Sequence, residues 1–474
     1  MRTADDYLAR LKGLARNVHY QGELVQRDHP DILPGIRVIS ETFNVDDPEL
    51  KGLATATSHL SGARINRFCH IHRTTDDLLA KQRLTRILCR RTGGCIQRCM
   101  GVDALNALSV VTKLAEDATG VPYHARFNAY LRYFQDNDLV GNAAQTDVKG
   151  DRSKRPFEQE DPDLYLRVVE RRADGIVVRG AKAHNTVGPY ADEIIVLPTR
   201  LMTPADTDWS VAFAVPADAP GVHLFVRCTH ARPREILKAP ATEYGASDSL
   251  TVFDDVFVPW DRVFLCGETA FAGQLAALFA TYHRHSYTGC KAAVSDIMTG
   301  AAALVAEYNG VAKAPHVRDK LAELIAVGEL VFAAGLAASV TAQPATSGTM
   351  VPDIVYTNVG RYHAGVNVMR EFETVIDLAG GLPATLPPER EWLDPVSARF
   401  LDKYIKRNPA VSAENQHRLF RFLSDALCSS TSGVMQVAGI HGGGSPIMER
   451  IAITGLYDLE QRKADVRRLA GITS

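Results

Sequence analysis

A block of short strand-like segments lies between two helical regions, and this order limits the fold more than any other feature. From about residue 144 to residue 270 the apolar runs are short, rich in β-branched and aromatic residues, and interrupted by Pro, Gly or Asp. The run LYLRVVERRADGIVVRG predicts a hairpin that turns at Asp174 and Gly175. Because such spacing is typical of compact antiparallel barrels and sandwiches, we expect a central antiparallel β-barrel domain over residues 144–270.

Both flanking regions have the apolar spacing of helices. Before the strands, TDDLLAKQRLTRILCRR and VDALNALSVVTKLAEDAT show it, and Thr3 is predicted to cap the first helix. After the strands, four long helical segments predict a bundle. A chain of 474 residues is long enough for two or three domains. We therefore expect an α+β fold, with an N-terminal helical domain over 1–143 and a C-terminal four-helix bundle domain over 271–474.

Charge and composition exclude several classes of partner. Lys and Arg number 53 against 55 Asp and Glu, so a basic surface for nucleic acid or anionic lipid is not expected. Charges run through the N-terminal segment, which is therefore not expected to be a signal peptide. No uninterrupted apolar run approaches the roughly 18 residues of a membrane span. Eight cysteines in a chain of this length predict reduced thiols in a cytoplasmic protein.

Two helical segments far apart in the sequence carry soft metal ligands. In GGCIQRCMG, Cys95 and Cys99 would share one face of a helix, one turn apart, with Gln97 pointing away from Cys95. This spacing matches neither the metal knuckle nor the redox motif of closer cysteine pairs. In YHRHSYTGCK, His283 and Cys290 fall on one helix side. Three thiols and an imidazole suit an iron–sulfur cluster or a zinc ion, although buried cysteines are also common in protein cores.

Six motifs in order resemble the 4-hydroxybutyryl-CoA dehydratase family, within the wider group of 4-hydroxyphenylacetate 3-hydroxylase-like flavoproteins. They are GGCIQRCMGVDALNA, TDVKGDR, GIVVRGAKAHNT, FDDVFVPWDRVFLC, YHRHSYTGCK and HGGGSP. The resemblance implies an acyl-CoA dehydrogenase-like fold and a homotetramer with FAD at its subunit interfaces. It also implies one FAD and one [4Fe–4S] cluster per chain. The implied cluster ligands are Cys95, Cys99, His283 and Cys290.

The same resemblance implies a radical-type reaction of an acyl-CoA. The reaction is dehydration of 4-hydroxybutyryl-CoA, or a related hydroxyacyl-CoA, to crotonyl-CoA, vinylacetyl-CoA Δ-isomerisation, or both. The hydrogen removed from C3 is not acidic in the substrate, which explains the need for redox and Lewis-acid chemistry. His283 would be both ligand and base, Tyr287 would hydrogen-bond the leaving group, and Lys291 would support its charge. Without the resemblance, Tyr287 would be interpreted as an aromatic residue of helix packing and Lys291 as a residue of a solvated helix face.

For FAD, the resemblance implies residues in a loop, at a strand end and in the bundle. They are Thr146, Lys149, Asp151, Arg152, His184, Thr186, Lys320, Gly380, Gly381 and Leu382. The glycine segment would serve a neighbouring subunit. The sequence HGGGS at 441–445 could form an anion-binding nest beside the acyl-CoA. It also occurs in esterases, but no GxSxG motif accompanies it, so hydrolysis is not favoured.

Two carboxylates of the family pattern are altered. Asp248 is a shorter acid where a catalytic glutamate is expected, and Ala438 stands where an acid is expected. Alanine carries no proton, so isomerisation or a different acyl-CoA becomes more favourable than simple dehydration. The alternative function is a two-component flavin-dependent aromatic monooxygenase of the 4-hydroxyphenylacetate type, which has no need of the four soft ligands. A zinc-stabilised helical protein is the third hypothesis.

Overall fold

The N-terminal region contains five helices whose ends follow their own sequence signals. In the computed structural model, which describes residues 1–230 and 234–472, these helices are α1 (Ala4–Gly13), α2 (Leu33–Ser40), α3 (Thr75–Thr92), α4 (Cys99–Thr119) and α5 (Tyr123–Asp136). Thr3 caps α1 in a capping box with Asp6, so the prediction for Thr3 is confirmed. Helix α3 ends at Gly93, whose left-handed φ of 71° suits a glycine.

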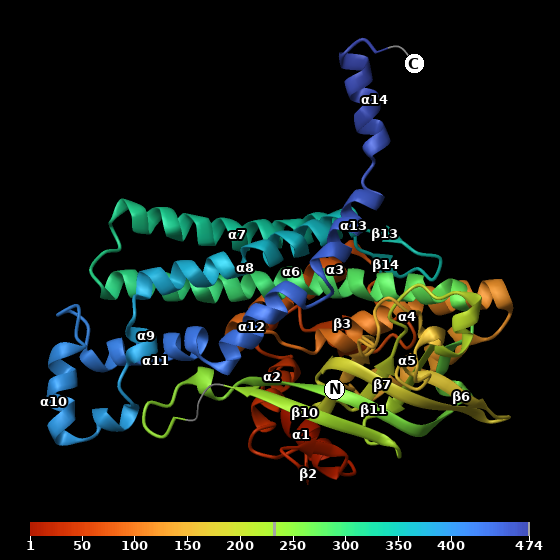
Figure 1. The fold of residues 1–474 in the computed structure, drawn as a ribbon, viewed down its shortest axis with the longest axis horizontal. Coiled ribbons are helices and arrows are strands. Elements are labelled where there is room, and N and C mark those ends of the chain that lie inside the picture. The colour runs from red at the N-terminus through yellow and green to blue at the C-terminus, as the bar shows by residue number, and fades with distance from the viewer. Residues whose placement is uncertain (231–233, 473–474) are drawn as a thin grey trace.

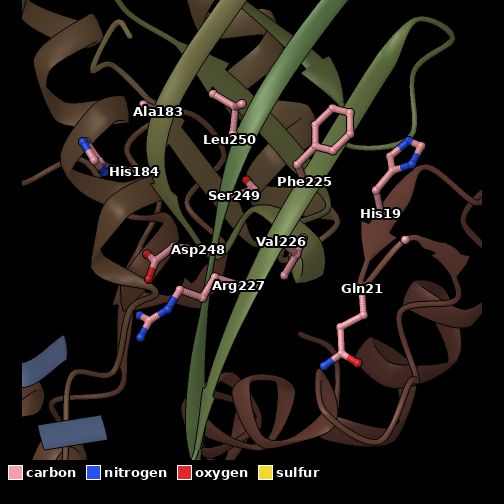
Figure 2. A pocket seen from close by; sticks show the side chains of 11 residues that line it. His19, Gln21, Ala183, His184, Phe225, Val226, Arg227, Asp248, Ser249 and Leu250 are labelled. Atoms are coloured by element: carbon pink, nitrogen blue, oxygen red, sulfur yellow. The ribbon is translucent and has the colours of Figure 1, made fainter. Parts of the chain in front are cut away.

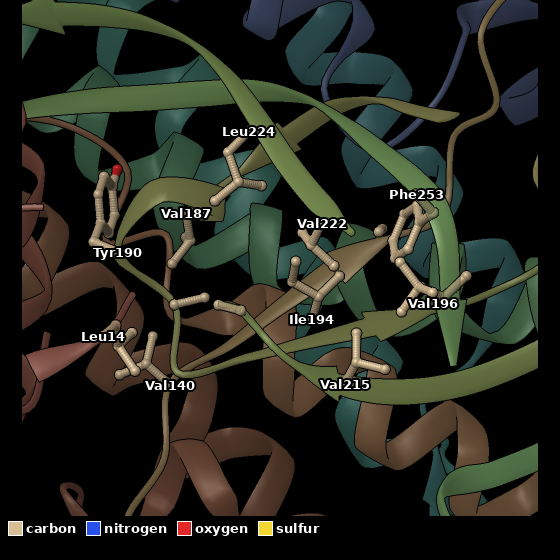
Figure 3. Close-up of a cluster of buried hydrophobic side chains, with 14 of the residues drawn as sticks. Leu14, Val140, Val187, Tyr190, Ile194, Val196, Val215, Val222, Leu224 and Phe253 are labelled. Carbon is tan, nitrogen blue, oxygen red and sulfur yellow. The ribbon is translucent and has the colours of Figure 1, made fainter. Parts of the chain in front are cut away.

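The strands form two sheets packed face to face. The larger has the order β2-β1-β10-β11-β7-β6 and the smaller β12-β9-β8-β5. Their bounds are β1 Val18–Tyr20, β2 Glu23–Val25, β5 Gly141–Ala144, β6 Arg167–Arg171, β7 Gly175–Thr186, β8 Glu193–Val196, β9 Val211–Pro216, β10 Val222–His230, β11 Gly245–Pro259 and β12 Val263–Cys266. Figure 3 shows the buried side chains between them, among them Ile194, Val215 and Phe253. Strands β6 and β7 pair as the predicted hairpin.

The predicted antiparallel barrel is wrong in two respects. Within the described residues the two sheets stay separate rather than closing, which is the sandwich arrangement. Two strand pairs are parallel, β1 with β10 and β5 with β8. Strand β1, from the N-terminal region, pairs with β10, which would otherwise be the edge strand of the larger sheet, and β5 comes from the end of the same region to pair with β8. A short-range strand pattern does not show such long-range pairing.

Three long helices form the C-terminal bundle and lie side by side (Figure 1): α6 (Thr269–Tyr308), α7 (Pro315–Val340) and α8 (Ile354–Ala379). The N-terminal α3 packs against them, with Arg86 bound to Asp296 of α6 and Glu329 of α7. The predicted fourth helix is instead two, α11 (Ala413–Cys428) and α12 (Ser430–His441), because Ser429 adopts extended backbone and caps α12. Two short β-pairs complete the strands, β3 Thr55–Thr57 with β4 Arg64–Asn66, and β13 Gln343–Pro344 with β14 Met350–Val351.

The C-terminal segment leaves the body of the molecule. Helices α9 (Leu382–Thr385) and α10 (Pro395–Tyr404) lie at one end of the bundle, α13 (Pro446–Leu456) follows a glycine loop, and α14 (Leu459–Leu469) projects outward (Figure 1). By length and composition alone, α6 and α7 are apolar enough to cross a membrane. Of their most apolar windows, 61% is buried inside the fold in α6 and 28% in α7. The apolar character of α6 is that of a central core helix.

Candidate active site

The segment that carries Cys95 is a loop, so the predicted helical pairing of Cys95 and Cys99 is wrong. Helix α3 ends at Gly93, and α4 begins only at Cys99. Between them Gln97 has a left-handed φ of 64°, which turns the chain back. Gln97 is buried, accepts a hydrogen bond from the Tyr190 hydroxyl and donates one of 3.1 Å to the Gly245 carbonyl. It therefore fixes the loop instead of pointing away from the site.

The structure nevertheless brings the four predicted soft ligands together. The free thiols of Cys290 and Cys99 are hydrogen-bond partners of the Cys95 sulfur, and they lower the pKa of Cys95 well below its usual value. Ligand atoms of Cys99 and His283 lie within 4.8 Å of each other. These three thiols and the His283 imidazole form what we call the cysteine cradle. Cys99 and Cys290 are buried and Cys95 is exposed, so the cradle has an open side. Three thiols and one imidazole, converging from a loop and two helices, fit the donor set of an iron–sulfur cluster.

Asp103 is the strongest site residue that sequence reasoning missed. It is fully buried on α4, one helical turn after Cys99, and its Oδ2 lies 3.1 Å from His283 Nδ1. Its other oxygen accepts hydrogen bonds of 2.9 Å from Lys81 Nζ and 2.9 Å from Ser286 Oγ. A carboxylate in this place holds the proton on Nδ1 and leaves Nε2 free. The four-residue spacing from Cys99 is the one signal that pointed to it.

Cys89 is a second missed residue. This buried, free α3 thiol is a hydrogen-bond partner of the Cys290 thiol, and together with Cys95 it raises the pKa of Cys290. Its sulfur also accepts a hydrogen bond of 3.2 Å from the Ile96 backbone N–H. Cys89 therefore joins α3, the cysteine loop and α6 on the buried side of the cradle.

Tyr287 and Lys291 both lie on α6 and both have partners inside the chain. The Tyr287 hydroxyl donates to the Gly439 carbonyl over 3.2 Å, and burial raises the pKa of Tyr287. The Arg361 guanidinium lies 4.3 Å from the Tyr287 ring centroid. Lys291 Nζ forms a buried ion pair of 2.5 Å with Glu371. The predicted lysine is thus charge-compensated by an acid that sequence reasoning did not identify.

Asp248 and two of the predicted flavin residues meet at the end of β7. Thr186 Oγ1 donates to Asp248 Oδ1 over 2.6 Å, and burial raises the pKa of Asp248. His184 has a left-handed φ of 59° at a register shift between β7 and β11, a strained conformation that recurs at functional sites. Asp248 and His184 line a pocket of about 600 Å³ (Figure 2).

The remaining predicted flavin residues form two groups that one chain does not bring together. Lys149, Asp151 and Arg152 are exposed on the loop after β5, while Thr146 is half-buried at its start. Lys320 pairs with Asp377 at the far end of the bundle. There Gly380, Gly381 and Leu382 join α8 to α9 (Figure 1).

The loop from His441 to Ser445 lies against the imidazole of His283. A side-chain carbon built at Gly443 would lie 3.6 Å from His283 Cδ2. Arg284 donates a hydrogen bond of 2.8 Å to the Gly443 carbonyl, and Arg361 donates one of 2.7 Å to the Gly442 carbonyl. The loop carbonyls, which face two buried arginines, therefore hold this segment in place.

Comparisons with known proteins cover the whole chain. Residues 3–265 match the model "4-hydroxyphenylacetate 3-hydroxylase N terminal" and residues 272–471 match "4-hydroxyphenylacetate 3-hydroxylase C terminal". The chain is 38% identical to the 4-hydroxybutyryl-CoA dehydratase/vinylacetyl-CoA-Δ-isomerase of Clostridium aminobutyricum, over 100% of both proteins. It is 29% identical to the oxygenase component of the 4-hydroxyphenylacetate 3-monooxygenase of Thermus thermophilus, over 98% of the chain and 96% of that protein.

Two solved structures show the same fold over nearly the whole chain. One is an oxygen-tolerant archaeal 4-hydroxybutyryl-CoA dehydratase from N. maritimus, with a TM-score of 0.95 and 37% identity, covering 100% of this chain and 95% of that one. The other is the oxygenase component of a 4-hydroxyphenylacetate 3-monooxygenase complexed with FAD, with a TM-score of 0.88 and 26% identity. That likeness covers 99% of this chain and 98% of the monooxygenase.

Proposed function

Since the chain belongs to the 4-hydroxyphenylacetate 3-hydroxylase family and, within it, to the 4-hydroxybutyryl-CoA dehydratase/vinylacetyl-CoA-Δ-isomerase relatives, we propose that it is an acyl-CoA dehydratase and Δ-isomerase. The reaction proposed is dehydration of 4-hydroxybutyryl-CoA or a related hydroxyacyl-CoA, with isomerisation of the vinylacetyl type of thioester. The observation that carries it is the convergence of Cys95, Cys99 and Cys290 on the same cradle as His283.

The proposed cofactors are a [4Fe–4S] cluster and FAD. Cys95, Cys99, Cys290 and His283 would hold the cluster, and the loop from Thr146 to Arg152 together with His184 and Thr186 would hold FAD. When bound, the cluster supplies Lewis acidity and the flavin supplies one-electron chemistry. A mononuclear zinc site with the same ligands is the competing assignment. The binding of FAD by a related oxygenase supports the flavin part of the proposal.

The protein's own residues then have distinct tasks. His283, whose Nδ1 proton is held by Asp103, has only Nε2 for the other two tasks, so it would accept a substrate proton there only when that nitrogen does not hold the cluster. Tyr287 would donate its hydroxyl proton in a hydrogen bond to the departing oxygen, turning from the Gly439 carbonyl to do so. Asp248, whose raised pKa results from burial, would handle the α-proton. Lys291 would balance negative charge beside Cys290, with Glu371 keeping it in place.

The loss of an acid at position 438 shifts the proposed balance of the two reactions. Ala438 lies on α12, one residue before the Gly439 carbonyl that accepts the Tyr287 hydroxyl bond. Ala438 is exposed within the single chain, and the family resemblance is what places an acid of the site at this position. Without a proton donor at this place, loss of hydroxide is disfavoured more than movement of a double bond. We infer that isomerisation is the faster reaction.

A homotetramer with FAD at its interfaces is the proposed assembly. Large apolar side chains are exposed along α7, α8, α13 and α14, among them Leu330, Met369, Ile451 and Leu469. Exposed apolar faces of this extent favour contact with further chains. The separation of the two groups of predicted flavin residues within one chain supports the same arrangement.

The aromatic monooxygenase is the second candidate, favoured by the oxygenase relatives. Anaerobic purification followed by determination of iron, acid-labile sulfide and FAD per chain separates the two. About four irons and four sulfides with one FAD, together with formation of crotonyl-CoA, is the expected result. Flavin without iron, together with hydroxylation of a phenol in the presence of reduced flavin, would show that the chain is a monooxygenase and not a dehydratase. One zinc per chain without flavin would contradict both the dehydratase and the monooxygenase assignments.

A further inference from the structure

The pocket of about 600 Å³ extends well beyond the residues that the proposed reaction uses. It lies on the outer face of the larger sheet, where side chains of β1, β10, β11 and β7 point away from the core (Figure 2). Cross-strand pairing arranges these side chains in two rows. The polar row is Arg227 and Asp248, which line the pocket and pair with each other, and it continues outside the lining to Thr186, which pairs with Asp248. The apolar row is His19, Phe225 and Leu250, paired in the same way.

The polar row leads to the cysteine cradle. The Ser247 backbone N–H, next to Asp248, donates 3.0 Å to the Tyr190 hydroxyl, which in turn donates to Gln97 between the two cysteines. Asp248 and Thr186 are joined by their 2.6 Å hydrogen bond. The reacting end of a ligand in this pocket would therefore lie over the polar row.

The apolar row forms a flat and accessible surface. The rings of His19 and Phe225 are stacked, with centroids 4.6 Å apart and an interplanar angle of 16°. Phe225 is 46% exposed and Leu250 40% exposed, although both lie on a central part of the sheet. Exposed aromatic and aliphatic side chains side by side are typical of a surface that binds a planar ring.

Cations accompany this surface. Among the described residues, Arg227 makes one side-chain hydrogen bond, of 3.3 Å to Thr229, and no ion pair. Two imidazoles also lie beside Phe225, because His19 Nε2 is 3.2 Å from His223 Nδ1 and His19 stacks on the Phe225 ring. Asp248, its cross-strand neighbour, interacts with Arg227 through charge but forms no close ion pair with it, so the exposed guanidinium can still bind a phosphate.

FAD and the CoA thioester of the proposed reaction both contain adenine, and the position of the apolar row distinguishes between them. The predicted flavin loop lies at the β7 side, where Asp147 bridges to Lys182. His19 and Phe225 lie on the opposite side of Asp248, across β11 and β10. A ligand that reaches Asp248 from this side approaches it from the direction away from the flavin loop.

We propose that Phe225, stacked on His19, binds the adenine ring of the CoA thioester, with Arg227 holding a phosphate and Leu250 contacting the pantetheine arm. The inference rests on the proposed function, because it names the part of the site that recognises the CoA moiety. The pocket is large enough for such a portion of a ligand, since ligand pockets span roughly 300–1,000 Å³.

The test uses full-length, cofactor-loaded protein and compares Phe225→Ala with Phe257→Ala. Phe257, on β11 outside the pocket, is 40% exposed against 46% for Phe225 and serves as the matched control. Titration calorimetry with free CoA and with pantetheine is the first measurement. Phe225→Ala should weaken CoA binding at least about tenfold, as expected for a lost base stack, and leave pantetheine binding unchanged. Phe257→Ala should change neither.

Three results would overturn the proposal. Equal CoA affinity in both variants would remove Phe225 from the CoA site. Loss of FAD from Phe225→Ala at unchanged CoA affinity would show that this surface binds the adenine ring of FAD. A smaller assembly mass of Phe225→Ala at unchanged CoA affinity would show that this surface contacts a second copy of the chain. If hydroxyacyl-CoA is not converted but CoA binding still depends on Phe225, the proposed reaction fails while the CoA site stands.

Discussion

His283 Nδ1 lies 3.1 Å from Asp103 Oδ2, inside a buried group that also contains Lys81 and Ser286. The two residues are 180 positions apart in the sequence, on α4 and α6. This contact fixes which imidazole nitrogen can serve the site, because a carboxylate beside Nδ1 retains its proton. The same helix α4 supplies Cys99, so one element carries both a proposed ligand and the residue that orients another.

Replacing Asp103 by Asn should weaken the site without removing a proposed ligand. The amide retains the shape but not the charge, so it no longer holds the Nδ1 proton firmly and leaves Lys81 without its anion. Iron affinity and turnover should each fall roughly 10- to 100-fold, measured by iron content after chelator challenge and by initial rates. Asp206→Asn is the control, since this buried acid pairs with Arg155 away from the site. Equal iron retention in both variants would contradict the role of Asp103.

Cys99→Ala and His283→Ala should each remove bound iron and activity while FAD remains. The reason is that each side chain supplies one donor atom of a site built from four, whereas the predicted flavin residues lie elsewhere. Iron, sulfide and flavin determinations on purified variants check this outcome. Cys428→Ala, an exposed cysteine on α11, should behave as the unmodified protein. Full iron occupancy with normal turnover in the His283 variant would show that the imidazole is not a ligand.

Ala438→Glu should raise dehydration relative to isomerisation. The new acid would stand next to Gly439, whose carbonyl accepts the Tyr287 hydroxyl bond, and so would give the leaving hydroxyl a proton donor. The measurement is the ratio of crotonyl-CoA formation from the 4-hydroxy and from the vinylacetyl thioester, each at saturation. Ala438→Gln, similar in size but unable to donate an acidic proton, should leave the ratio unchanged. An unchanged ratio in the Glu variant would show that position 438 does not control the balance.

His417 should make the fold sensitive to acid. It is fully buried against Trp392, and burial lowers its pKa from 6.5 to about 4. Between these values the unfolded chain binds more protons than the folded one, so stability falls as pH falls. From pH 7 to pH 5 this group should cost about 2 kcal/mol of unfolding free energy.

Urea unfolding of His417→Phe at both pH values checks this contribution. The phenyl ring keeps the contact with Trp392 but does not titrate, so the variant should lose about 2 kcal/mol less than the unmodified protein on acidification. His316→Phe, at an exposed position in the first turn of α7, is the control and should have the same pH dependence of unfolding as the unmodified protein. The same acid sensitivity in the His417 variant would assign the effect to other groups.

The helical and strand regions were predictable because their signals are local. Thr3 caps α1 with Asp6 three residues away, and Asp174-Gly175 joins β6 to β7 through a turn of few residues. The sandwich and the split fourth helix were not, because β1 joins β10 from some 200 residues away in sequence and a single extended residue, Ser429, separates α11 from α12. Hydrophobic periodicity does not encode either feature.

The sequence by itself determined the order of helical, strand and helical regions and the types of donor side chain at Cys95, Cys99, Cys290 and His283. These follow from residue chemistry and from spacing within single segments. Only the tertiary structure decided that Cys95 reaches the cradle from a loop, that Asp103 orients His283, and that the pocket continues to Phe225. The physical reason is that such contacts join elements far apart in the chain, and the packing of whole helices and sheets sets their distances.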